Sequence, residues 1–153
     1  MEKSINAIRF LGMDAINKAN SGHPGIVLGA APTMYNLYTK HLRVTPNNPR
    51  WFNRDRFVLA AGHGSAMLYA TLHLAGYKLS MEDLKKFRQL NSICAGHPEY
   101  HPGTGIETTT GPLGQGIANS VGFAVAEEIL KKKLGKEIIN HKTYVLAGDG
   151  CLM

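Results

Sequence analysis

Two short apolar runs in this sequence each end in a polar residue held between glycines. Residues 56–61 (RFVLAA) lead into Gly62-His63-Gly64, and residues 143–147 (TYVLA) lead into Gly148-Asp149-Gly150. Apolar runs of this length, bounded by turn residues, are typical of strands buried in a sheet. Helical segments surround them, and this alternation predicts an α/β fold in which helices flank a largely parallel sheet.

Five helices are expected, over residues 4–19, 26–41, 65–74, 81–87 and 116–134. Pro32 is placed near the beginning of the second helix, where a proline is best tolerated. Ser65 is expected to cap the third helix and Gly76 to end it. Ser80 and Asp83 form a capping-box pattern before the fourth helix. Gly122 is expected to let the last helix pack closely against a neighbour.

Glycine and histidine gather in the expected loops. Twelve of the 17 glycines and four of the seven histidines fall around residues 22–25, 62–64, 96–116 and 148–150. Ligands of parallel α/β sheets bind outside the carboxyl ends of the strands, and the turns at 62–64 and 148–150 occupy that position. Glycine there lets the backbone approach a ligand closely. These loops are therefore the candidate binding site.

Charge and composition exclude several classes of protein. The net charge is +6, but the basic residues are scattered except for a run at 131–133 that ends the last expected helix. No basic surface interleaved with aromatic residues is visible, so nucleic acid is not an expected partner. No apolar stretch approaches the length of a membrane span, and the N-terminus lacks a signal-peptide pattern. With only two cysteines, the expected location is the cytoplasm.

Two turns at strand ends carry candidate ligands. Asp149 could occupy one coordination position of Mg²⁺ while a phosphate ligand supplies others, although an ordinary turn explains a lone Gly-Asp-Gly equally simply. His63 stands before an expected helix N-terminus, which is a natural position for binding a phosphate. A histidine satisfied by its local backbone is the structural alternative.

The Gly-His-Pro sequence occurs twice, at His23 and at His97. Proline restricts the backbone after each histidine and glycine allows it to turn. Two imidazoles held in this way could bind the hydroxyls of a polyhydroxylated substrate or transfer protons near pH 7. Either histidine alone could be structural, and the repetition favours a functional role.

Other readings of the motifs are rejected. The glycines at 111–116 resemble a dinucleotide fingerprint, but a long loop and not a strand precedes them. Neither Cys94 nor Cys151 has the surroundings expected of a nucleophile, and no pair of Cys or His residues repeats at the spacing of zinc ligands.

Five motifs in order resemble the N-terminal part of transketolases. They are SGHPG at 21–25, GHGS at 62–65, GHPE at 96–99, TTGPLGQG at 109–116 and VLAGDGC at 145–151. The resemblance covers essentially the whole chain. It implies the thiamine-diphosphate-binding fold, here the N-terminal part of the diphosphate-binding domain over residues 1–153, with the other domains absent.

The resemblance also implies an activity and its cofactors. Transketolases transfer a two-carbon ketol unit from a ketose phosphate donor to an aldose phosphate acceptor in the pentose phosphate pathway, using thiamine diphosphate and a divalent cation, Mg²⁺ or Ca²⁺. By matching positions, Asp149 would bind the metal, and His63 and Gly150 the diphosphate. Gly111 and Leu113 would contact the ring system of the cofactor. His23 and His97 would contact substrate hydroxyls as catalytic residues.

The sequence departs from the family pattern at its end. The expected covering helix after residue 147, the asparagine that completes the metal motif and the glutamate that activates the cofactor are not present. We therefore expect a cut chain that is inactive alone and that works as a homodimer when intact, or with a C-terminal subunit if split. A non-catalytic remnant that keeps the fold and a related enzyme such as dihydroxyacetone synthase are the alternatives.

Overall fold

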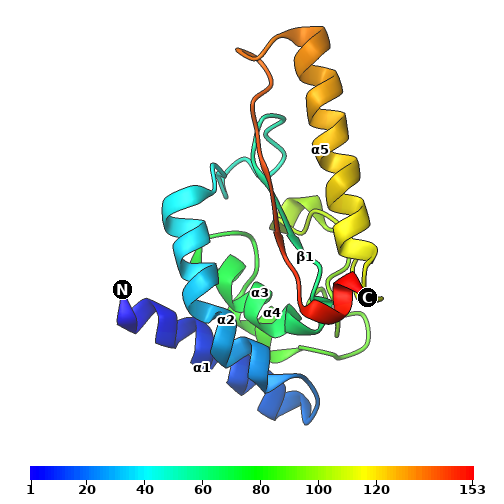
Figure 1. The fold of residues 1–153 in the computed structure, drawn as a ribbon. Coiled ribbons are helices and arrows are strands. Elements are labelled where there is room, and N and C mark those ends of the chain that lie inside the picture. The colour runs from blue at the N-terminus through cyan, green and yellow to red at the C-terminus, as the bar shows by residue number, and fades with distance from the viewer.

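The computed structural model describes all 153 residues and has a two-stranded parallel sheet at its centre. Strands β1 (Arg56–Leu59) and β2 (Thr143–Leu146) pair in register, Arg56 opposite Thr143 and Leu59 opposite Leu146. The two strands lie side by side although more than half of the chain separates them (Figure 1). The parallel sheet predicted from the two apolar runs is confirmed.

Helical segments make up most of the rest of the ordered structure. In chain order they are α1 (Glu2–Ala19), α2 (Pro24–Asn36), the π-helical turn η1 (Leu37–His41), η2 (Gly62–Gly64), α3 (Ser65–Leu74), α4 (Met81–Lys85), η3 (Pro102–Thr104), α5 (Gln115–Leu134) and η4 (Asp149–Leu152), where η2 to η4 are 3₁₀ turns. All five expected helices are present. No helix has both the length and the hydrophobicity required to cross a lipid bilayer.

The two faces of β1 are covered by different helices. Phe57 and Leu59 belong to the buried core that α1, α2 and α3 form with this strand. Ala60, next along the chain, contacts the start of α5 at Gly116. This is the alternation that a strand produces, because successive side chains point to opposite faces. Figure 1 accordingly shows α5 along one side of the strands and α1 to α3 gathered on the other.

Three sequence expectations about packing are wrong. The second strand is only partly buried: Tyr144 and Leu146 pack against the core, but Val145 on the opposite face is 40% exposed. Pro32 lies well inside α2 and not near its beginning. A Cβ placed on Gly122 would have no neighbour within 4 Å, so this is not the glycine through which α5 packs.

Candidate functional site

The turns that follow both strands lie at one edge of the sheet. Because β1 and β2 are parallel and end in register, the chain leaves both at the same edge. Turn η2 carries His63 just beyond β1, and turn η4 begins with Asp149 just beyond β2. The sequence-based prediction that these two residues share the ligand edge of the sheet is consistent with this arrangement.

The loop before α5 closes on this edge through direct backbone contact. Thr110 Oγ1 donates a 2.8 Å hydrogen bond to the carbonyl of Leu59 at the end of β1. A Cβ placed on Gly62 would lie 2.8 Å from the backbone nitrogen of Gly111, so only glycine fits at position 62. Gly111 itself has a φ of +150°, a conformation that disfavours other residues.

The same loop also reaches the turn after β2. A Cβ on Gly150 would lie 3.3 Å from Leu113 Cδ1, and a Cβ on Gly114 would lie 3.5 Å from the Cys151 carbonyl. Leu113 leaves most of its side chain exposed. Three of the four residues that the resemblance assigned to the cofactor, Gly111, Leu113 and Gly150, are thus connected through one short loop.

Three histidines from three separate loops form one electrostatic cluster. The rings of His23 and His63 lie 5.1 Å apart between centroids, tilted by 58°. Burial, and then the imidazoles of His23 and His97, lower the pKa of His63. Burial, and then the charges of Arg88 and His23, lower the pKa of His97. His63 and His97 are therefore mainly neutral at pH 7, where an imidazole can both accept and donate a proton.

Gly111 joins the histidines to the glycine turns. A Cβ on Gly111 would lie 3.3 Å from Cγ of His97, so the ring of that histidine rests on the backbone of the loop. Since the same glycine touches Gly62, the structure brings together His23, His63, His97 and the loop at 110–114 around this contact.

Helix α3 holds the second Gly-His-Pro loop in place. Ser65 Oγ donates to the carbonyl of Gly96 over 2.7 Å, and the Tyr69 hydroxyl donates to the carbonyls of Ala95 at 2.9 Å and His97 at 3.3 Å. The expectation that Ser65 caps α3 is wrong, because its side chain makes this contact and Gly64 is the capping residue. No local signal predicts these contacts, because the partners lie 26 to 31 residues away.

The carboxylate of Asp149 is exposed and makes no hydrogen bond or ion pair with the chain. No group of three His, Cys, Asp or Glu side chains in the 153 residues is arranged to hold a metal ion. Asp149 is therefore not part of a ready-made cluster of such side chains, and the phosphate oxygens of a bound ligand could supply further positions to a metal at this carboxylate.

Both cysteines lie in the interior. Cys94 and Cys151 are free thiols and are buried. Burial, reinforced by the negative charge of Asp83, raises the pKa of Cys94 to about 12. Its thiol stays protonated at neutral pH, which agrees with the prediction that it is no nucleophile.

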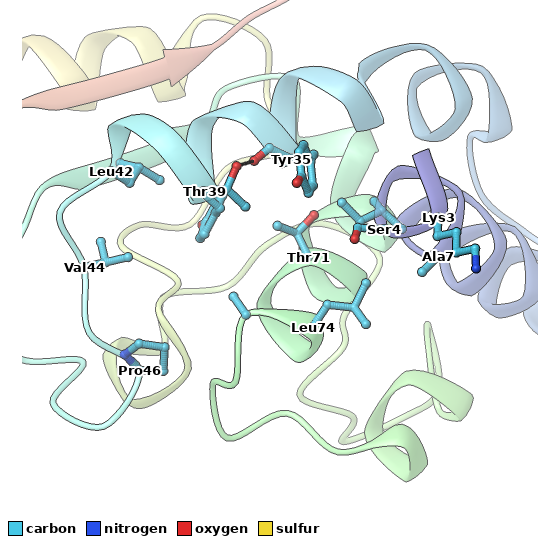
Figure 2. Close-up of a pocket in the computed structure, with 13 residues that line it drawn as sticks. Lys3, Ser4, Ala7, Tyr35, Thr39, Leu42, Val44, Pro46, Thr71 and Leu74 are labelled. Carbon is cyan, nitrogen blue, oxygen red and sulfur yellow. Dashed lines mark hydrogen bonds between the residues drawn. The ribbon is translucent and has the colours of Figure 1, made fainter. Parts of the chain in front are cut away.

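A separate apolar cavity lies away from the histidine cluster and the glycine turns. It has a volume of about 510 Å³ and lies between α1, the end of α2 with η1, and the end of α3. Figure 2 shows it lined by side chains such as Tyr35, Leu42 and Leu74, with Thr39 bonded to the Tyr35 carbonyl over 2.6 Å. It contains none of the predicted site residues.

Known proteins resemble the chain over its whole length. The sequence profile of the family described as transketolase, thiamine diphosphate binding domain, matches residues 1–153. A probable transketolase of Streptococcus pneumoniae is 59% identical over 154 residues, which covers 98% of this chain and 23% of that protein. The structure of transketolase from Leishmania mexicana superposes with a TM-score of 0.95 at 51% identity, covering 99% of this chain and 23% of that one.

A transketolase from Pichia stipitis, solved in complex with sedoheptulose 7-phosphate, matches with a TM-score of 0.92 at 51% identity. The match covers 99% of this chain and 23% of the Pichia stipitis enzyme. The chain thus spans about a quarter of the length of these relatives.

Proposed function

The chain belongs to the transketolase family, and it matches the thiamine-diphosphate-binding domain of that family. From this premise we propose that it supplies the diphosphate-binding part of a transketolase site. The reaction is the transfer of a two-carbon ketol unit between sugar phosphates. The observation that carries the proposal is the contact of Gly111 with both Gly62 and His97. This contact joins the loop at 110–114, which we assign to the cofactor, to the histidine cluster.

The residues at this edge fit a diphosphate and a divalent cation. Glycines at 62, 111 and 150 lie where a Cβ would press against the opposing loop, so glycine lets these loops pack closely together at this edge. His63 is neutral at pH 7 and would donate a hydrogen bond to a diphosphate oxygen. Asp149 is an exposed carboxylate and would bind Mg²⁺ or Ca²⁺ together with diphosphate oxygens.

The remaining predicted residues would orient the cofactor and the substrate. Gly150 would lie by the diphosphate, and Gly111 and Leu113 would contact the ring system. When bound, thiamine diphosphate supplies the carbon nucleophile for cleavage of a carbon–carbon bond. The chain's own histidines, His23 and His97, would bind the hydroxyls of the sugar phosphate and accept or return a proton at an imidazole nitrogen.

We propose that these 153 residues do not catalyse ketol transfer by themselves. They hold no set of side chains that completes a metal site, and they span 23% of the length of the relatives. A second subunit or a further domain would supply the rest of the site, as a homodimer or as a separate C-terminal subunit. A transketolase rate measured with the purified chain alone would contradict this.

Calorimetric titration of the chain with thiamine diphosphate and Mg²⁺ tests the binding function. We expect saturable heat that disappears without Mg²⁺, that is lost in Asp149→Ala and that weakens in His63→Ala. Two exposed residues away from the site provide matched controls: Asp14→Ala on α1 and His41→Ala on η1 should bind as the unmodified chain does. Absence of binding to the unmodified chain would support the alternative of a non-catalytic remnant.

A further inference from the structure

Arg88 touches both of the Gly-His-Pro loops. Its Nη1 donates a 2.9 Å hydrogen bond to Oγ of Ser21, which precedes His23 by two positions. Its Nε lies 3.3 Å from the place of a Cβ on Gly96, the residue before His97. One side chain thus connects two loops that are more than 60 residues apart in the chain.

The backbone of Arg88 is held in an uncommon conformation. Its φ is +60°, in the left-handed region that residues other than glycine rarely adopt. The Arg88 amide donates a 2.9 Å hydrogen bond to the carbonyl of Cys94, which closes the turn between α4 and the second Gly-His-Pro loop. Conformations of this kind persist where the surrounding structure enforces them and are frequent at functional sites.

The positive charge of Arg88 is not neutralised. No carboxylate forms an ion pair with this guanidinium, and its Nε and Nη2 are buried without a hydrogen-bond partner. It lines a polar hollow of about 600 Å³ together with Ser21, Gly96 and Glu99. Because a guanidinium is always protonated, a permanent cation stands beside the loop that carries His97.

From these contacts we propose that Arg88 is a positioning residue, which braces the two Gly-His-Pro loops against each other and holds a permanent positive charge beside the loop that carries His97. The proposal rests on the proposed function, in which His23 and His97 contact the substrate. A neutral His97 retains a free nitrogen that can accept a proton from a substrate hydroxyl.

Several other groups surround His97. His23, on the first Gly-His-Pro loop, and His63, on η2, are close enough to affect it electrostatically. The Tyr69 hydroxyl on α3 donates to the His97 carbonyl, and Gly111 packs against the His97 ring. Glu99 follows two positions later on the same loop. After burial, Arg88 is the largest contributor to the lowered pKa of His97, ahead of His23. The charge of Arg88 can therefore be tested separately from the rest of the cluster.

Diethyl pyrocarbonate provides the test, because it acylates an imidazole only when that imidazole is neutral. The pH dependence of the acylation rate at each histidine, followed by peptide mass spectrometry, reports the pKa of that histidine in the unmodified fold. Arg88→Gln should move the His97 profile to higher pH, and Arg88→Lys, which keeps the charge, should leave it near that of the parent chain. His41, exposed on η1, should show the same profile in all three proteins.

An unchanged His97 profile in Arg88→Gln, or an equal shift in Arg88→Lys, would overturn the proposal. Circular dichroism checks that each variant is folded. If Arg88→Gln does not fold, Arg88→Met, which keeps an apolar stem and removes the charge, provides the same test: the His97 profile should move to higher pH, and an unchanged profile would contradict the proposal. The readout needs no cofactor, so failure of cofactor binding would overturn only the proposed function.

Discussion

Gly116, in the first turn of α5, lies directly against Ala60, which follows β1: a Cβ on Gly116 would be only 2.5 Å from the Ala60 Cα. The helix and the strand therefore meet backbone to backbone at this point. The contact lies between the loop at 110–114 and the turn that carries His63. It sets the distance between two parts of the proposed site.

Replacing Gly116 with alanine should destabilise the fold. The added methyl group meets backbone that cannot move aside, and overpacking of this kind costs roughly 1–3 kcal/mol. Gly122→Ala, in the same helix but with open space around it, should stabilise by about 0.5–1 kcal/mol through helix propensity. Urea unfolding followed by circular dichroism measures both. Similar effects from the two variants would show that the contact with Ala60 does not limit packing.

Glu107→Gln should destabilise the loop that leads to Gly111. Glu107 accepts two hydrogen bonds from Arg54, Nε to Oε1 at 2.7 Å and Nη2 to Oε2 at 2.6 Å, and the side chains are only 7% and 13% exposed. Removing the carboxylate charge leaves a buried cation without its partner, which costs on the order of 3 kcal/mol.

The exposed pair of Glu82 with Lys85 on α4 provides the control for Glu107. Glu82→Gln should leave the midpoint of urea unfolding unchanged, because exposed ion pairs contribute little. We also expect faster amide exchange at Thr110 and Gly111 in Glu107→Gln. Equal midpoints for the two variants would mean that the buried pair does not anchor the loop.

Stability should fall in mild acid, partly through His141. Burial, and then the charge of Arg56, lower the pKa of His141, whose ring is almost fully buried. Below the ordinary histidine pKa of about 6.5, the unfolded chain therefore binds a proton that folded His141 does not. The stability that neutral His141 contributes is therefore fully present above about pH 6.5. It is lost as the pH falls through the lower pKa that His141 has in the folded chain.

His141→Gln should flatten the dependence of the unfolding free energy on pH between about pH 7 and pH 5. His41→Gln, at an exposed position, should leave the curve with the slope of the unmodified chain. Part of the slope should persist in His141→Gln, because His63 and His97 also have lowered pKa values. Parallel curves for His141→Gln and the unmodified chain would contradict this assignment.

Signals that act over a few residues were predicted well. The capping box is present: Ser80 Oγ accepts from the Asp83 amide at 3.1 Å, and Asp83 accepts from the Ser80 amide at 2.8 Å. Gly76, with a φ of +89°, follows the end of α3. In each case, the residues that decide the structure are neighbours in the sequence, so their pattern can be read directly.

Side-chain contacts between distant segments were not predicted. Gly122 was expected to pack closely and Gly116 does so, because the path of β1 and not the helix sequence decides which face of α5 meets the strand. Ser65 was assigned to a cap although its acceptor is Gly96. Arg88 carries no local motif, and its importance arises only from contacts with Ser21 and Gly96.

The sequence by itself determined the alternation of strands and helices, the glycine turns at the strand ends and the identity of the candidate residues, because period, turn chemistry and motif are local properties of a chain. Only the tertiary structure decided that β1 and β2 pair, that Gly111 touches both Gly62 and His97, and that Arg88 joins the histidine loops. Those relationships depend on which buried surfaces pack together, and packing is a property of the whole fold.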